Sequence, residues 1–143
     1  RSSDLLIINS REETLLEKKM YSDLIKEKRC LIPTTGFFEW KDKKKYCITT
    51  ESNKMFSMAG IYNSFINKDG RLEKSFTIIT TSANEKMSSI HHRMPVIIPS
   101  SLEKSYLDVC TPIDDIKSML RPYKGLDLLI TSCDNRPEQM SLF

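Results

Sequence analysis

Glu39 is the one acid within the aromatic stretch Phe37-Phe38-Glu39-Trp40, which also holds the only tryptophan of the chain. A carboxylate between aromatic side chains must be desolvated, hydrogen-bonded or placed at a cleft. Desolvation raises the pKa of a glutamate, and a raised pKa suits a general acid or base. Because alternate side chains of a strand share a face, Phe37 and Glu39 should point one way and Phe38 and Trp40 the other. The simpler alternative is a glutamate at the mouth of a strand, facing water.

Two further places combine polar side chains with the ends of strand-like runs. Asn9 and Arg11 follow the apolar run at residues 5–8, and His91 and Arg93 stand in a loop that holds both histidines of the chain. A histidine titrates near neutrality and can move protons. Arginines can hold phosphates without reading a base sequence. A loop of this kind is more often structural than catalytic.

The segments around Glu39 predict how it is held. Residues 31–32 end a buried strand, and residues 33–36 form a turn in which Pro presets φ and Gly tolerates a positive φ. Residues 37–40 are rich in strand formers and predict a second strand. The charged run at residues 41–45 predicts a solvated hairpin turn, with a phosphate-binding loop as the less favoured alternative. The return strand follows at residues 46–50.

The rest of the chain predicts an α+β fold: a curved, mainly antiparallel, barrel-like sheet with flanking helices. Ser10 and Glu13 could form a capping box that starts the first helix, or the chain could stay extended until about Leu15. Gly60, inside a strand, indicates a bulge or a close backbone approach. Further strands are expected at residues 5–8, 55–62, 76–81, 96–98 and 126–131, and helices at residues 16–27, at 83–87 and in two segments after residue 100.

Composition narrows the classes of protein. The 143 residues suffice for one domain, and no apolar run is long enough to span a bilayer. Twenty-two Lys and Arg against 19 Asp and Glu give a net charge of +3, too small to indicate nucleic-acid binding. The four cysteines form no C-x-x-C pair, which predicts buried free thiols in a reducing cytoplasm. Two histidines without ligand spacing argue against a zinc site.

Four blocks, taken together, resemble the signature blocks of the SOS-response-associated peptidase (SRAP) domain. They are INSREET (residues 8–14), RCLIPTTGFFEWK (29–41), FSMAGIY (56–62) and TIITTSAN…IHHRMPVII (within 77–98). They follow one another at family-like spacing over roughly the first two-thirds of the chain. The last third agrees with the family only in a generic order of helices and strand. The resemblance implies a single SRAP-like domain over residues 1–143.

The family resemblance implies a function in DNA repair. Members bind single-stranded DNA at abasic sites, and an N-terminal Cys attacks the ring-opened sugar aldehyde. The α-amine and the thiol of that Cys form a thiazolidine, a stable crosslink that shields the lesion. The same site is implied to act as a peptidase that releases a leader ahead of the Cys. The expected partner is abasic single-stranded DNA, bound by a cytoplasmic, nucleoid-associated monomer without a cofactor, a metal or a membrane.

Three residues match catalytic positions of the family motifs. Asn9 matches the residue that orients the Cys and the sugar, Glu39 the acid–base carboxylate and His91 the catalytic histidine. Schiff-base and thiazolidine formation need proton transfers, which a glutamate and a histidine can supply.

Three more residues match DNA-contacting positions. Arg11 would bind a phosphate beside the lesion, and Arg93 would be a second DNA-contacting arginine. Trp40 would lie on the DNA face, where an aromatic ring can stack on an exposed base.

The chain departs from the family in two respects. The expected nucleophile lies far upstream of the Asn9 motif, whereas this chain begins at Arg1 and lacks an initiator Met. No cysteine matches the nucleophile by motif, and Cys30 stands at a non-catalytic position. We therefore expect a missing N-terminal segment and a chain that is inactive alone. His92 stands where the family usually carries an acid, which adds possible positive charge.

Two other functional classes remain open. A purely binding module for single-stranded DNA predicts that Glu39 and His91 diverge in space. A cysteine peptidase acting on other proteins needs a thiol within hydrogen-bond reach of His91.

Overall fold

The computed structural model describes residues 8–52, 54–125 and 127–133. Within them, six strands form a larger sheet of order β1-β6-β5-β2, with β7 beside β6 and β8 beside β5, and a smaller sheet has order β3-β4-β9. The strands are β1 (Ile8–Arg11), β2 (Arg29–Thr34), β3 (Gly36–Lys41), β4 (Lys44–Thr50), β5 (Phe56–Ile66), β6 (Leu72–Ser82), β7 (Arg93–Pro95), β8 (Ile97–Ile98) and β9 (Leu128–Ser132). The helices are η1 (Glu12–Thr14), α1 (Lys19–Glu27), α2 (Glu85–Ser88), η2 (Ser100–Leu102), α3 (Glu103–Leu107) and α4 (Ile113–Met119).

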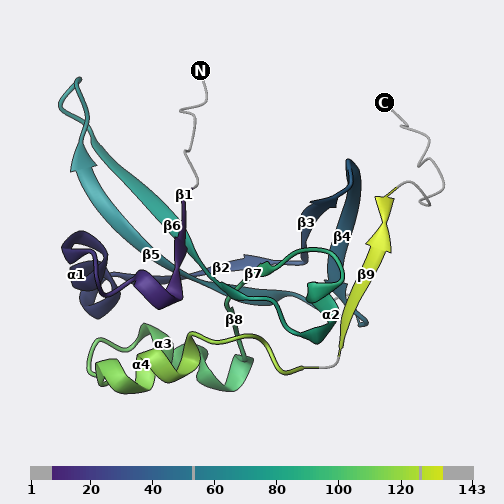
Figure 1. The fold of residues 1–143 in the computed structure, drawn as a ribbon. Helices are drawn as coiled ribbons and strands as arrows, with labels where there is room; N and C mark the ends of the chain where they lie inside the picture. Colours follow the sequence, from purple (N-terminus) through teal and green to yellow (C-terminus); the bar gives the residue numbers. More distant parts are fainter. Residues whose placement is uncertain (1–7, 53, 126, 134–143) are drawn as a thin grey trace.

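The predicted α+β class with mainly antiparallel strands and flanking helices is confirmed. Every strand pairing is antiparallel except that of β1 with β6, which is parallel. The strands are divided between two sheets, however, and in neither does the strand order of the described residues return to its first strand. Figure 1 shows α1, α3 and α4 gathered at one end of the larger sheet and β3, β4 and β9 at the other.

Two apolar clusters hold these parts together. One packs the larger sheet against the helices and includes the fully buried Ile25, Ile61, Ile79 and Tyr106. The other joins the smaller sheet to α2 and β7 and is built from Ile48, Met87, Met94, Ile97 and Leu128. Burial of apolar surface at about 25 cal/mol per Å² is the main stabilising contribution of both. Met87 and Met94 of the second cluster flank the segment that carries His91.

The stretch from residue 29 to 41 crosses from one sheet to the other. β2 pairs with β5 up to Thr34, and β3 begins at Gly36 and pairs with β4, so the predicted four-residue turn shortens to the bend at Thr35. Gly36 does not use the positive φ that glycine tolerates, since Gly70 is the one glycine of the described residues with a positive φ. A Cβ at this position would lie 2.7 Å from the carbonyl oxygen of Ile48, so Gly36 is required by the close approach of β4.

The start of the first helix also differs from the capping-box hypothesis. The chain makes a 3-10 turn at Glu12–Thr14 with no side-chain cap, and α1 begins only at Lys19. Glu13 does not cap the helix, because its carboxylate binds Arg93. The predicted strand at residues 5–8 lies outside the described residues except for Ile8, and the strand β1 continues through Asn9 to Arg11.

Gly60 sits at a close approach, as expected. A Cβ there would meet the Ile32 side chain at 2.4 Å and the Cys30 sulfur at 3.0 Å. The hydroxyl of the buried Tyr106 donates to the Gly60 carbonyl oxygen at 2.7 Å, which anchors α3 to the middle of β5.

Candidate active site

A pocket of about 390 Å³ lies where β1, β3, β6 and β7 meet. Five of the six site residues expected from the sequence line it: Asn9, Arg11, Glu39, His91 and Arg93. The rest of its wall is formed by Phe37, Met58, Ile78, Thr80, His92, Met94 and Pro95. Residues up to 86 positions apart in the chain, Asn9 and Pro95, are therefore brought to one concave surface.

Asn9 and Arg11 reach the pocket from β1. Their spacing of two residues puts both side chains on one face of the strand, while Ser10 between them is buried on the other. The parallel register with β6 places Asn9 opposite Ile78 and Arg11 opposite Thr80. Both side chains are exposed, so an amide and a guanidinium are available at the pocket rim.

Glu39 reaches the pocket from β3, the outer strand of the smaller sheet. The predicted alternation is confirmed: Phe37 and Glu39 face the pocket, and Phe38 and Trp40 face away and are more than half exposed. Phe37 packs edge-on against Phe56, with ring centroids 6.4 Å apart. Glu39 itself is half-buried, at the mouth of the pocket rather than in open solvent.

His91 follows α2 and is held through its backbone and through one ring nitrogen. Its backbone N–H donates to the Met87 carbonyl oxygen at 2.9 Å, and its Nδ1 accepts the Arg93 backbone N–H at 3.0 Å. A neutral imidazole that accepts at Nδ1 carries its proton on Nε2. The Arg93 carbonyl oxygen, 3.3 Å from the same Nδ1, would require the opposite tautomer, and the shorter N–H donation favours the Nε2–H form.

His92 stacks on His91 with ring centroids 4.5 Å apart and the planes inclined by 23°. It is exposed and also lines the pocket. The position where the family resemblance implies an acid therefore presents a second imidazole to the same cavity.

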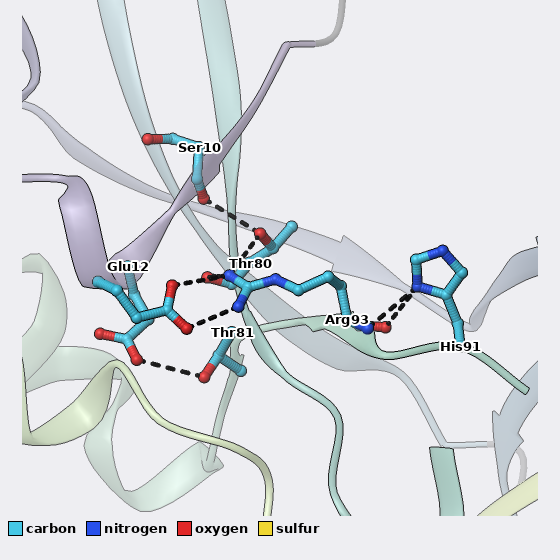
Figure 2. A network of polar contacts seen from close by, with 7 residues as sticks. Ser10, Glu12, Thr80, Thr81, His91 and Arg93 are labelled. Carbon is cyan, nitrogen blue, oxygen red and sulfur yellow. Dashed lines mark hydrogen bonds and ion pairs between the residues drawn. The ribbon is translucent and has the colours of Figure 1, made fainter. Parts of the chain in front are cut away.

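Arg93 lines the pocket but its guanidinium is already engaged, as Figure 2 shows. Nη1 and Nη2 donate to the two carboxylate oxygens of Glu13 at 2.6 and 2.9 Å, and Nη2 also donates to the carbonyl and hydroxyl oxygens of Thr80. The hydrogen bond from Arg93 lowers the pKa of Glu13 below its ordinary value. The neighbouring Glu12 accepts from Thr81, and its pKa is raised by burial and then by the charge of Glu13.

The sequence pattern did not predict the contact of Glu13 with Arg93. Two features of the sequence were consistent with this contact: Glu13 lies in the same block as Asn9 and Arg11, and its charge is opposite to that of Arg93. The capping-box pattern gave Glu13 a local role and so concealed a contact across 80 residues.

Trp40 does not line the pocket. It lies on the opposite face of β3 beside Phe38, and the Lys45 ammonium stands 4.0 Å from the Phe38 ring centroid and 5.9 Å from that of Trp40. The face of β3 that points away from the pocket therefore carries two exposed aromatic rings, Phe38 and Trp40, with the Lys45 ammonium close to both.

A larger hollow of about 850 Å³ lies between α2, residues 121–125 and β9. Its volume is larger and its wall is more apolar than those of the pocket of Glu39 and His91, but none of the expected site residues lines it. The smaller pocket is the candidate active site, because it contains the side chains that can transfer protons.

The rival classes can be compared with this geometry. Glu39 and His91 share one pocket, whereas a purely binding module predicted that they diverge. All four cysteines are free, and none lines the pocket, whereas a cysteine peptidase built from this chain needs a thiol there. Among the described residues no group of three or more His, Cys, Asp or Glu is placed to hold a metal, and no helix could cross a membrane.

Comparison with known proteins identifies relatives by sequence. The family model described as "SOS response associated peptidase (SRAP)" matches residues 1–136. The abasic site processing protein YoqW of Bacillus subtilis is 38% identical over 144 residues, a match that covers 94% of this chain and 64% of YoqW. The abasic site processing protein HMCES of Gallus gallus is 32% identical over 145 residues, which covers 82% of this chain and 43% of HMCES. The chain thus spans less than two thirds of these relatives.

Solved structures share the fold. A protein from Bacteroides thetaiotaomicron superposes with a TM-score of 0.81 at 35% identity, covering 87% of this chain and 57% of that one. A protein from Bordetella bronchiseptica superposes with a TM-score of 0.77 at 22% identity, covering 87% of this chain and 64% of that one, and this second likeness concerns the fold alone.

Proposed function

Because the chain belongs to the SOS response associated peptidase (SRAP) family, we propose that it binds single-stranded DNA at abasic sites as a monomer and forms part of a site that links covalently to the lesion. The observation that carries the proposal is the single pocket shared by Asn9, Glu39 and His91. The relatives named above as abasic site processing proteins support the same class of substrate.

The covalent step is proposed to use an N-terminal Cys of the full-length protein. Its α-amine attacks the aldehyde carbon of the ring-opened sugar, water leaves, and the thiol then adds to the resulting imine carbon to close a thiazolidine. Only an N-terminal Cys offers an amine and a thiol on one residue. The absence of any of the four cysteines from the pocket wall is compatible with a nucleophile from another segment.

Three pocket residues would assist these proton transfers. Glu39 would accept a proton from the attacking amine and return it to the departing oxygen. His91, with Nδ1 occupied by the Arg93 backbone N–H, would act through Nε2. The exposed amide of Asn9 would orient the sugar and the Cys by hydrogen bonds.

Two arginines would contact the DNA backbone, and one aromatic side chain would contact a base. Arg11 is exposed at the rim and suits a phosphate, whereas Arg93 would contact DNA only through the edge that Glu13 leaves open. Trp40 lies on the face of β3 that points away from the pocket. It would stack on a base only if the DNA passes over β3, the outer strand of the smaller sheet.

The test is a denaturing gel of the full-length protein mixed with single-stranded DNA that carries one abasic site. We expect a heat-stable shifted band with the abasic strand and none with the same strand carrying an intact base. Glu39→Gln should slow band formation about 100-fold while leaving DNA affinity within about twofold. If Glu39→Gln reacts at the wild-type rate, Glu39 is not the acid–base group. If the wild type gives no band, the proposed crosslinking reaction is refuted.

Phosphate binding is tested separately by titrations at several salt concentrations. Arg11→Ala should weaken binding to every single-stranded sequence and lower the slope of log affinity against log salt by about 1. Equal affinity for duplex and single-stranded DNA would contradict the proposed binding mode.

The proposal includes release of a leader ahead of the N-terminal Cys by the same pocket. Intact mass spectrometry of the full-length protein and of its Glu39→Gln and His91→Ala variants checks this part. We expect a leader that is removed in the wild type and retained in the variants, and equal masses for all three proteins would exclude self-processing.

A further inference from the structure

The Glu13–Arg93 ion pair joins two segments that are 80 residues apart. The contact is bidentate, with Nη1 2.6 Å from Oε1 and Nη2 2.9 Å from Oε2. The Arg93 side chain is 14% exposed and that of Glu13 is 45% exposed. Bidentate arginine–carboxylate contacts fix orientation as well as distance, so this pair can hold the two segments in one relative position.

The guanidinium of Arg93 also forms hydrogen bonds with Thr80 of β6 in the larger sheet. Nη2 donates to the Thr80 carbonyl oxygen at 3.0 Å and approaches the Thr80 hydroxyl at 3.2 Å, while the buried Nε has no hydrogen-bond partner among the described residues. The edge that a phosphate would bind bidentately is therefore occupied by Glu13. Removing the carboxylate would leave a largely buried cation without its counter-charge, which is costly.

The two partners stand directly beside the polar residues of the pocket. Glu13 follows Arg11 by two residues in the turn that ends β1, and the charge of Arg11 contributes to lowering the pKa of Glu13. Arg93 follows His91 by two residues, and its backbone N–H is the donor to His91 Nδ1. The ion pair thus bridges the strand that carries Asn9 and Arg11 and the segment that carries His91.

We propose that Glu13 is a positioning residue of this pocket. It acts through Arg93 to fix the position of the His91 ring relative to the side chains of Asn9 and Arg11. The proposal rests on the proposed function for its reaction readout, but its structural part does not. In this arrangement Arg93 keeps its bidentate edge on Glu13 when DNA is bound, and Arg11 supplies the phosphate contact. A proton-transfer group displaced by a fraction of an ångström loses rate before it loses substrate affinity.

Glu12 provides a matched control. It belongs to the same 3-10 turn and carries the same charge, but it contacts Thr81 and makes no hydrogen bond to Arg93. Glu12→Gln and Glu13→Gln therefore remove equal charge from the vicinity of the DNA. A difference between the two variants reports the contact with Arg93 and cancels the general electrostatic effect.

The reaction test measures single-turnover crosslinking of the full-length protein to single-stranded DNA with one abasic site, at saturating protein. We expect Glu12→Gln to react within about twofold of the wild type and Glu13→Gln to react about tenfold more slowly, with DNA affinity changed about twofold or less. Glu13→Asp should recover part of the rate, and Glu13→Gln combined with Arg93→Lys should be no slower than the slower single variant. Equal rates for the two Gln variants, or a loss confined to DNA affinity, would overturn the proposal.

A second readout is independent of DNA. The ¹⁵N resonances of the His91 ring distinguish its tautomers, and we expect an Nε2–H signature in the wild type and in Glu12→Gln. Glu13→Gln should shift these resonances toward a mixture, and unchanged resonances would overturn the positioning role. If Glu13→Gln does not fold, Glu13→Asp and Arg93→Lys carry the same measurement. A wild type that neither binds nor crosslinks the abasic strand refutes the proposed function, while the His91 signals still decide the role of Glu13.

Discussion

Arg29 and Arg93 both bring a largely buried guanidinium to a junction of distant segments, but their acceptors differ. Arg93, which lines the pocket, binds the half-exposed carboxylate of Glu13. Arg29, which is 7% exposed, is surrounded by backbone carbonyl oxygens at 2.5 to 3.0 Å, and the four acceptors are Ile25, Lys26, Tyr106 and Asp108.

The carbonyl cage of Arg29 follows from how helices end. The last carbonyls of a helix lack partners within the helix and carry partial negative charge. Arg29 starts β2 directly after α1 and reaches across to the end of α3, so one guanidinium satisfies both helix ends. The acceptors of Arg29 among the described residues are carbonyl oxygens, which do not titrate, so its contacts should change only when the fold is lost. The acceptor of Arg93 includes a carboxylate, so its contacts can respond to pH, to salt and to a ligand.

The largest expected effect concerns Arg29. Arg29→Met keeps the length of the side chain but removes every donor, so carbonyls at the ends of two helices lose their partner. We expect the free energy of unfolding to fall by about 3–5 kcal/mol, measured by urea denaturation followed by circular dichroism. Arg29→Lys, with three donors, should lose less. A loss below about 1 kcal/mol for Arg29→Met would show that water replaces the guanidinium and would end the contrast with Arg93.

A smaller effect is expected from the same change at the pocket. Arg93→Met should lower the free energy of unfolding by about 1–2 kcal/mol, because the half-exposed Glu13 regains water when its partner is lost. The measurement is the same urea titration. If Arg93→Met is as destabilising as Arg29→Met, then Arg93 is a core residue and the pocket is not a separable region.

The pH dependence should separate the two arginines further. The folded-state pKa of Glu13 lies below its ordinary value of 4.5, so the stability from the pair is fully present above that pH and is lost as the pH falls through the folded value. The stability difference between wild type and Glu13→Gln should therefore shrink below about pH 4.5. The difference between wild type and Arg29→Lys should stay constant from pH 7 to 4, since carbonyl oxygens do not titrate. A Glu13→Gln difference that does not change with pH would contradict the ionic nature of the pair.

The smallest effect is expected at Glu12, and its sign is opposite. Burial raises the pKa of Glu12, so its charged form costs stability at neutral pH, and this cost disappears as the pH falls through the raised value. Glu12→Gln should raise the free energy of unfolding at pH 7 by about 0.3 kcal/mol, since water screens a half-buried group. Parallel denaturations at pH 7 and pH 4 measure it, and destabilisation at pH 7 would indicate that the Thr81 contact outweighs the burial.

Local patterns in the sequence predicted much of the framework. The alternation in Phe37-Phe38-Glu39-Trp40 gave the correct face for Glu39, because side chains along a strand must alternate. The charged run after Trp40 gave the hairpin between β3 and β4, where Asp42 and Lys43 adopt positive φ values of 50° and 65°. These features depend on neighbouring residues, so they are visible without the fold.

Other features failed because they depend on distant contacts. The local pattern explained Gly36 by the backbone freedom of a turn, whereas the structure requires glycine there because β4 approaches closely. Nothing in the local pattern showed that β2 and β3 belong to different sheets, since a bend within one sheet and a crossing between two look alike in sequence. The Trp40 assignment to the DNA face remains a prediction, and its ring lies outside the pocket.

The candidate site divides in the same way. The residue types and motif spacing were sufficient to nominate Asn9, Glu39 and His91, because the chemistry of an amide, a carboxylate and an imidazole belongs to the side chains themselves. The parallel pairing of β1 with β6 and the antiparallel pairing of β6 with β7 bring Asn9 and His91 to one pocket and Glu13 to Arg93. Glu39 reaches the same pocket because the chain crosses from β2 in the larger sheet to β3 in the smaller one. Such long-range pairings depend on the burial and hydrogen bonding of the whole sheet, so no short stretch of sequence contains them.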